Sequence, residues 1–256
     1  MNNILPKLVW TFDSNVNLEK WGFHSHETML NLYINYYNLS ITSALKLGYE
    51  CILYTTDSFA KNFNDINVEI IIVDSEYCDL FDSFKFKVLK ERNDDYILID
   101  GDVILHNVLP NLKSDVSFER YETHSWNKFY NDYVNNLTSL NISNHIKEWT
   151  GQKRIRIMNC GLLHIQDIEF KNLYLNRWEY LSEFINNNIL ENRTDYTSTS
   201  AQYLLTELCD YYNKSIVDYF SSSDPNTYCH DMGDYKFTNP RVPTDYIIDN
   251  SPKKLM

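Results

Sequence analysis

The sequence has no long apolar run and no paired cysteines. No stretch approaches the roughly 18 uninterrupted apolar residues of a membrane span, and the start, Met1-Asn-Asn-Ile-Leu-Pro6, lacks the pattern of a secretory signal. The five cysteines are scattered without a Cys-x-x-Cys pair, which fits small buried residues better than a disulfide framework or a zinc site. We therefore expect a soluble, cytoplasmic protein.

Basic residues are also scarce. Lys and Arg number 23 against 35 Asp and Glu, which gives a net charge of -12, and the basic residues form few clusters. This balance argues against nucleic acid or an anionic membrane surface as the main partner. An anionic substrate would need a metal ion or a local basic patch.

The apolar residues that are present favour one large α/β domain. At 256 residues and 43% hydrophobic, the chain can bury a substantial core. We expect one domain over residues 1–236, followed by a polar tail over residues 237–256.

Alternating strand and helix patterns predict a mostly parallel central sheet with helices on both faces. A helix over residues 27–47 ends at Gly48 and lies between strands at 7–13 and 51–57, which is the arrangement of a parallel strand pair. Further strands are expected at 68–73, 96–105, 116–119, within 154–165 and at 216–220, with helices at 83–92, 169–189 and 198–212.

The strand at 96–105 is interrupted by Asp100-Gly101-Asp102. Carboxylates in a buried setting are costly unless they are paired or hold a metal ion, and Gly101 permits a sharp turn or a close approach. Two carboxylates at the carboxyl end of a strand suit Mn²⁺ or Mg²⁺, which would bridge to phosphate oxygens. A solvated Asp-Gly turn is the alternative.

Three further pieces could complete such a site. Asn159-Cys-Gly161 is expected as a small turn that leads into an apolar strand. In His230-Asp-Met-Gly233-Asp-Tyr-Lys236, the histidine could ligate a metal, the glycine could approach a phosphate and the lysine could supply charge. Of the lysines on the helix at 83–92, we select Lys87 as the one that could reach the carboxyl edge of the sheet.

Taken in order, these pieces resemble the family 8 glycosyltransferases, which include glycogenin and bacterial galactosyltransferases. The resemblance covers residues 8–236 and rests on the following features: the first strand, Tyr54-Thr-Thr-Asp57, the basic helix, Asp100-Gly-Asp102, Asn159-Cys-Gly161, a helix bearing Gln202, and His230-x-x-Gly-x-x-Lys236.

The resemblance implies a single GT-A domain that moves a sugar from a nucleotide-sugar donor, most simply a UDP-sugar, to an unknown acceptor (a glycan, a protein or a small molecule) with retention of configuration. It assigns Mn²⁺ (or Mg²⁺) to Asp100, Asp102 and His230. The remaining assignments are the nucleoside to Thr11, Phe12 and Asp13, the diphosphate to Lys87, Gly233 and Lys236, and the sugar pocket to Asn159, Gly161 and Gln202.

Two alternative functions stay open. The family carries an Asp directly before the Gln, where this chain has Ala201, so a homologue that binds nucleotide sugars without turnover is one alternative. A phosphatase of the haloacid-dehalogenase type is the other. It fits less well, because Ile104 stands where that class has Thr or Val and no later Asp-Asp pair follows.

Overall fold

The computed structural model describes residues 5–12, 26–73, 83–122, 124–154, 156–189, 193–224 and 226–230. Its contacts divide the chain into two compact units. The first unit contains Met1–Cys78, Asp95–Pro110 and Ser223–Met256, and the second contains Asp79–Asp94 and Asn111–Ser222. Each unit is described by itself.

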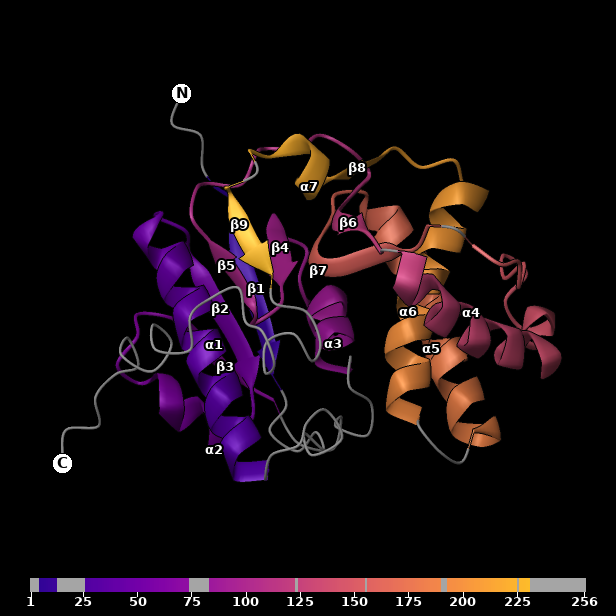
Figure 1. Cartoon of the computed structure of the whole chain (residues 1–256), viewed down its shortest axis with the longest axis horizontal. Coiled ribbons are helices and arrows are strands. Elements are labelled where there is room, and N and C mark those ends of the chain that lie inside the picture. The colour runs from indigo at the N-terminus through magenta and orange to yellow at the C-terminus, as the bar shows by residue number, and fades with distance from the viewer. Residues whose placement is uncertain are drawn as a thin grey trace. The chain divides into compact units, whose positions relative to one another are not determined.

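The first unit is built on a parallel four-stranded sheet in the order β3-β2-β1-β4 (Figure 1). Every residue of β2 and β4 is buried, as expected of strands that are covered on both faces. A separate antiparallel pair joins β5 to β9. The described elements are β1 (Lys7–Phe12), α1 (His26–Lys46), β2 (Cys51–Thr55), α2 (Asp57–Ala60), η2 (Lys61–Phe63), β3 (Glu69–Ile72), β4 (Tyr96–Ile99), β5 (Val103–Leu105) and β9 (Tyr228–His230).

The second unit packs helices around a strand trio in the order β7-β6-β8. Strand β6 pairs antiparallel with β7 and parallel with β8. Asp167 caps α5 by accepting a 2.9 Å hydrogen bond from Phe170 N. The described elements are α3 (Ser83–Glu91), β6 (Val116–Tyr121), α4 (His124–Ser139), η4 (Ile142–Asn144), β7 (Met158–Ile165), α5 (Ile168–Asn188), α6 (Arg193–Tyr211), β8 (Ile216–Asp218) and α7 (Tyr219–Ser222).

The structure confirms the α/β class, the mostly parallel strands and the flanking helices, and corrects several local expectations. The strand expected at 96–105 is two strands, β4 and β5, which belong to different sheets. No turn precedes the apolar strand at Asn159, because Asn159 and Gly161 already lie within β7. The last expected strand ends at Asp218 and continues into α7.

The structure does not test two expectations about domains. A single domain over residues 1–236 stays a prediction, and the tail at 237–256 lies outside the described residues.

Candidate functional site

The Asp100-Gly101-Asp102 segment forms a turn between β4 and β5. Val103 N donates a 3.1 Å hydrogen bond to Asp100 O, which closes the turn directly after the buried strand β4. The two carboxylates therefore leave the sheet at its carboxyl edge, where open α/β sheets bind ligands.

Strand β9 brings a distant histidine to this turn. Val103 pairs with His230 in the antiparallel β5-β9 ladder, which brings the backbone of His230 next to the turn that ends at Asp102. His230 Nε2 lies 3.2 Å from Asp102 Oδ1, and the two side chains are 5% and 11% exposed. The long sequence separation between these residues is closed by one short strand pair.

Asp100, Asp102 and His230 each offer a ligand atom, and these atoms all lie within 4.8 Å of one another. Ligands held about 2.1 Å from an octahedral ion lie about 3 Å apart when adjacent and about 4.2 Å apart when opposite. The spacing and the mixture of two carboxylates with one imidazole therefore fit Mn²⁺ or Mg²⁺. It is the one group of this kind found among the described residues.

Gly101 is required here by a close approach to an aromatic ring. A Cβ added at Gly101 would lie 2.1 Å from Cε2 of Tyr37 on α1, a distance that real Cβ atoms do not adopt. The Tyr37 hydroxyl donates a 2.7 Å hydrogen bond to Thr11 O at the end of β1, which fixes the ring. The expected close approach at Gly101 is thus to the protein's own side chain.

Serines on α1 hold β5 in place. Ser40 Oγ donates to Val103 O and accepts a 2.9 Å hydrogen bond from Trp10 Nε1, while Leu105 N donates to Ser43 Oγ at 3.0 Å. A strand of three residues is weak alone, so these bonds and β9 together fix the backbone that carries Asp102.

Two of the expected nucleoside-binding residues, Thr11 and Phe12, lie at the end of β1. Phe12 is 6% exposed and stacks on Phe59 with ring centroids 3.9 Å apart, so its ring belongs to the core. Thr11 is partly buried and contacts Tyr37 through its carbonyl. Asp13 lies outside the described residues.

In the second unit, the two expected sugar-pocket amides belong to one hydrogen-bonded group. Asn159 Nδ2 donates to Glu122 Oε1 at 2.7 Å, and the Tyr130 hydroxyl contacts both Glu122 Oε1 at 3.1 Å and Gln202 Oε1 at 2.8 Å. Gly161 joins the group through its N–H, which donates to Asn159 Oδ1 at 2.8 Å.

Glu122 lies at the centre of this group. It is 9% exposed, and its Oε2 atom has no hydrogen-bond partner among the described residues. Burial raises the pKa of Glu122, although the hydrogen bonds from Asn159 and Tyr130 oppose that rise. A carboxyl with a raised pKa and an open oxygen in a polar interior is typical of a functional group.

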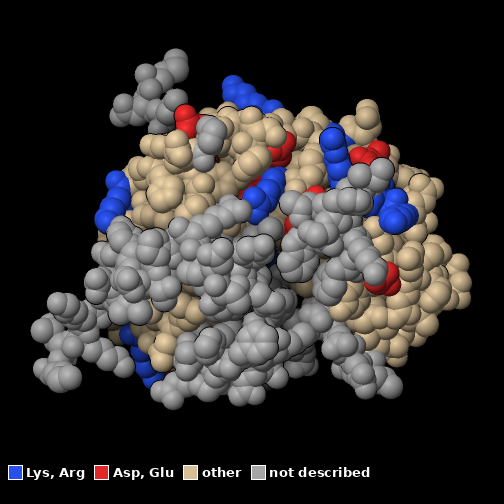
Figure 2. Space-filling view, viewed as in Figure 1, with Lys and Arg blue, Asp and Glu red and all other residues tan. Residues whose placement is uncertain are grey.

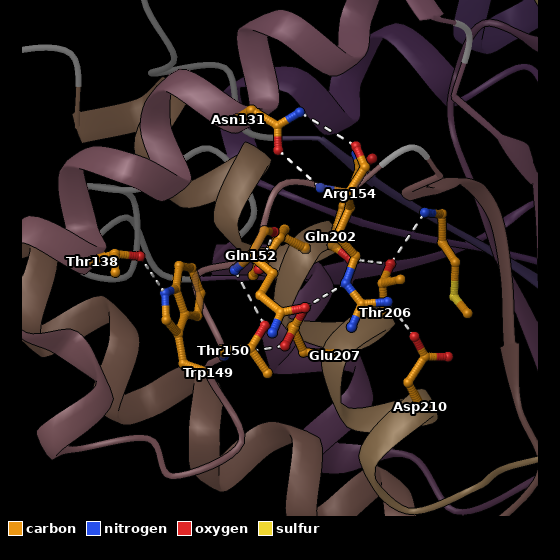
Figure 3. A network of polar contacts seen from close by, with 12 residues as sticks. Asn131, Thr138, Trp149, Thr150, Gln152, Arg154, Gln202, Thr206, Glu207 and Asp210 are labelled. Atoms are coloured by element: carbon orange, nitrogen blue, oxygen red, sulfur yellow. Dashed lines mark hydrogen bonds and ion pairs between the residues drawn. The ribbon is translucent and has the colours of Figure 1, made fainter.

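A network next to this group anchors the segment before β7 (Figure 3). Arg154 forms ion pairs with Glu207 and Asp210 on α6, and its backbone N donates to Asn131 Oδ1 at 3.1 Å. Glu207 Oε2 also accepts from Thr150 N at 3.1 Å. These contacts hold α4, the segment at 150–154 and α6 together around β7.

The remaining expected residues are not brought together in the described structure. Lys87 on α3 forms an ion pair with Glu91 at 3.1 Å, one turn along the same helix. Gly233 and Lys236 lie outside the described residues. Their assignment to the diphosphate stays a prediction.

Tyr37, Glu122 and Tyr130 were not among the site residues predicted from the sequence. Glu122 could have been found, because it is an acidic residue directly after a predicted strand, as Asp100 is. Tyr37 and Tyr130 carry no such signal, since in a chain with 20 tyrosines a tyrosine at helical spacing predicts only a core contact.

Acidic and basic side chains of the described residues are scattered over the face drawn in Figure 2, and neither sign forms a broad patch there. In the part of the chain that the structure describes, no helix is both long and apolar enough to cross a membrane.

Fold and site define an α/β protein with a candidate divalent-metal centre at the carboxyl edge of a parallel sheet. The chain belongs to a family of unknown function, DUF6734, whose profile matches residues 9–254. No curated protein sequence matches this chain.

Several solved structures are similar to this chain. The galactosyltransferase LgtC, in complex with donor and acceptor sugar analogues, is 12% identical with a TM-score of 0.46, and the match covers 77% of this chain and 71% of that one. Mouse xyloside xylosyltransferase 1 is 12% identical with a TM-score of 0.43, over 83% of this chain and 84% of that one.

A third similar structure is longer than this chain. The glycosyltransferase GlyE of Streptococcus pneumoniae TIGR4 is 11% identical with a TM-score of 0.42, and the match covers 97% of this chain but 52% of that one. Because all three identities are 11–12%, we base function on the side chains of the site and not on these likenesses.

Proposed function

We propose that this protein is a metal-dependent glycosyltransferase that moves a sugar from a nucleotide-sugar donor, most simply a UDP-sugar, to a glycan, protein or small-molecule acceptor, with retention of configuration. The main support for this proposal is that ligand atoms of Asp100, Asp102 and His230 all lie within 4.8 Å of one another. The resemblance of the sequence assigned the metal to these three residues, and the β5-β9 pair supplies a physical reason for their meeting.

Asp100 and Asp102 supply hard oxygen ligands, and His230 supplies a neutral nitrogen. A bound Mn²⁺ or Mg²⁺ would neutralise diphosphate oxygens and stabilise the charge that develops on them as the sugar leaves. A metal ion would be held by a ring nitrogen of His230 together with the two carboxylates, and ligation requires an unprotonated nitrogen.

The other residues take the roles that the resemblance gives them. Thr11, Phe12 and Asp13 contact the nucleoside, with Phe12 limited to its backbone because its ring is in the core. Lys87, Gly233 and Lys236 hold the diphosphate, and the Lys236 ammonium offsets the negative charge of the leaving group. Asn159, Gly161 and Gln202 line the sugar pocket, where a side-chain amide such as that of Gln202 is a suitable partner for a sugar hydroxyl.

The test is a hydrolysis and transfer panel of nucleotide sugars with Mn²⁺, compared with the same panel in chelator. We expect release of the nucleoside diphosphate from at least one donor with the metal and loss of that release in chelator. The Asp102→Asn variant should behave as the chelated protein does, while Asp65→Asn, at an exposed position in the same unit, should not. Phosphate release from a generic phosphoester, without donor hydrolysis, would instead favour a phosphatase.

One observation favours a second candidate, a nucleotide-sugar-binding protein without turnover. Ala201, where the family has Asp, is 4% exposed and its carbonyl accepts a 3.2 Å hydrogen bond from the Tyr174 hydroxyl on α5. Ala201 therefore contributes to the packing of α6 against α5 in the second unit. Calorimetric binding of UDP that depends on Mn²⁺, together with no turnover over the whole panel, would favour this candidate.

A further inference from the structure

The polar group around Tyr130 contains more than the two expected sugar-binding amides. Four side chains from four parts of the second unit form a chain of contacts in the order Asn159, Glu122, Tyr130 and Gln202. Asn159 lies on β7, Glu122 follows β6, Tyr130 lies on α4 and Gln202 lies on α6.

The backbone of Gln202 is held by hydrogen bonds that do not involve Asn159, Glu122 or Tyr130. Thr206 Oγ1 donates to Gln202 O at 2.9 Å and accepts from Met158 N on β7 at 3.2 Å, as Figure 3 shows. In the described part of the chain, the Gln202 carboxamide has the Tyr130 hydroxyl as its hydrogen-bond partner. The hydrogen bond to Tyr130 therefore determines which way the Gln202 carboxamide is turned.

The Tyr130 hydroxyl cannot serve both of its neighbours as a donor. The hydroxyl has one proton. It lies 3.1 Å from Glu122 Oε1 and 2.8 Å from Gln202 Oε1, and an ionised carboxylate oxygen and an amide oxygen can only accept a hydrogen bond. Both contacts are satisfied if Glu122 carries a proton and donates it to the tyrosine oxygen. If Glu122 is ionised, Tyr130 donates to the carboxylate, and the Gln202 amide must turn so that its nitrogen donates to Tyr130.

We propose that Tyr130 and Glu122 are positioning residues that set which end of the Gln202 carboxamide is presented to a ligand. With a protonated Glu122, Gln202 turns its NH₂ group away from Tyr130 and offers a donor. With an ionised Glu122, Gln202 offers its oxygen as an acceptor. The catalytic consequence rests on the proposed function, whereas the coupling itself does not.

The surroundings of Glu122 allow this change of state. Burial raises its pKa, and among the charged groups Glu119 on β6 raises it further while Arg120 on β6 lowers it. The side chains that contact it from α4 and β7 are Tyr130 and Asn159, which are both uncharged near neutral pH. The proton that Glu122 donates to Tyr130 would sit on Oε1, and a protonated Oε1 still has a lone pair to accept from Asn159 Nδ2.

The coupling can be measured by NMR without any substrate. Side-chain NH₂ resonances of Asn159 and Gln202 in ¹⁵N-labelled protein, assigned with Asn159→Ala and Gln202→Ala, are followed from pH 4 upward. We expect the chemical shifts of both NH₂ groups to change with pH with one shared midpoint. In Glu122→Gln, whose amide imitates the protonated acid, neither chemical shift should change with pH.

The decisive variant is Tyr130→Phe. Gln202 should lose its titration while Asn159, which contacts Glu122 directly, keeps it. The control Tyr180→Phe, at an exposed tyrosine of α5, should leave both titrations intact. A Gln202 titration that survives Tyr130→Phe, or a Gln202 resonance that is flat in the unmodified protein, would overturn the proposal.

Activity then separates this inference from the proposed function. With a donor identified in the panel, Tyr130→Phe should lower kcat about tenfold with KM nearly unchanged, and Glu122→Gln should remove the acidic or basic limb that Glu122 contributes to the pH profile. If no donor is turned over, the proposed function fails while the NMR result still decides the coupling. If a donor is turned over and Gln202 does not titrate, the positioning role fails alone.

Discussion

At the scale of the residue, Gly101 links the candidate metal centre to the end of β1. The backbone of Gly101 lies against the Tyr37 ring, and the Tyr37 hydroxyl is bonded to Thr11 O. Any side chain at position 101 would displace either the ring or the turn that carries Asp100 and Asp102. The glycine thus keeps two expected ligand-binding segments in register.

The Gly101→Ala substitution should therefore weaken the metal centre. We expect a loss of about 1–3 kcal/mol in the free energy of unfolding, as for overpacked cores, and weaker Mn²⁺ binding. Urea denaturation and calorimetric titration with Mn²⁺ measure the two effects.

A double variant shows whether the Tyr37 ring is the cause. Tyr37→Ala removes the obstacle, so the effects of Gly101→Ala and Tyr37→Ala on unfolding should sum to more than the effect of the double variant. Strict additivity would mean that the cost at position 101 arises elsewhere.

The sequence predicted some residues of the site and not others, for a physical reason. Asp100, Asp102 and His230 could be selected because carboxylates and imidazole in a strand-end setting have few structural uses. Tyr37 and Tyr130 could not, because their roles depend on contacts made in space: Tyr37 meets the backbone of Gly101 and Thr11, and the Tyr130 hydroxyl meets the side chains of Glu122 and Gln202. Asn159 was expected in a turn before the strand, and its actual place within β7 depends on pairing with β6.

At the scale of the element, a buried ion pair joins the segment before β7 to two helices. The Glu148 side chain is fully buried and accepts hydrogen bonds from Arg177 on α5 at 2.8 and 3.0 Å and from the Tyr212 hydroxyl at 2.7 Å. Burial raises the pKa of Glu148, but these hydrogen bonds outweigh it, and the pKa is lowered overall.

Removing the arginine should be costly. Arg177→Met leaves the buried carboxylate with the Tyr212 hydroxyl and the exposed Lys147 ammonium 4.0 Å away, and loss of one partner of a buried pair typically costs about 3–5 kcal/mol in the free energy of unfolding at neutral pH. Because the Glu148 pKa is depressed in the folded protein, its stabilising contribution is present above its ordinary value of 4.5 and is lost as the pH falls through the folded value. The difference in the free energy of unfolding between Arg177→Met and the unmodified protein should therefore become smaller below about pH 4.5.

Urea denaturation at neutral and acidic pH measures this difference. Lys90→Met is the matched control, because Lys90 and Glu179 form an exposed pair whose removal costs about 1 kcal/mol or less. Equal losses in Arg177→Met and Lys90→Met would contradict the assigned role of Glu148.

Hydrophobic periodicity predicted most elements of the fold and failed where contacts with other parts of the chain decide. Helix α1 and strands β1 to β3 match their expected positions within two residues at each end. The run at 96–105 reads as one strand, but the turn at Gly101 and the anchoring of Val103 by Ser40 divide it. Helix α4 was not expected at all, since the polar residues within 124–139 obscure its pattern.

At the scale of the whole molecule, charge makes the metal central to the proposal. A chain with a net charge of -12 repels a nucleoside diphosphate over distances up to the Debye length, about 8 Å at physiological salt. Binding of such an anion therefore requires a cation at the site, and the Asp100-Asp102-His230 centre is suited to hold it. Affinity for the diphosphate should depend steeply on the divalent ion.

The most direct measurement is calorimetric titration of UDP into the protein with Mn²⁺ and with chelator. We expect binding with Mn²⁺, none in chelator, and a loss of at least about tenfold in affinity for Asp102→Asn and for His230→Ala, with both variants folded by circular dichroism and Asp65→Asn unchanged. UDP binding of equal strength with and without Mn²⁺, or unchanged in folded Asp102→Asn, would contradict the metal centre and the transferase built on it.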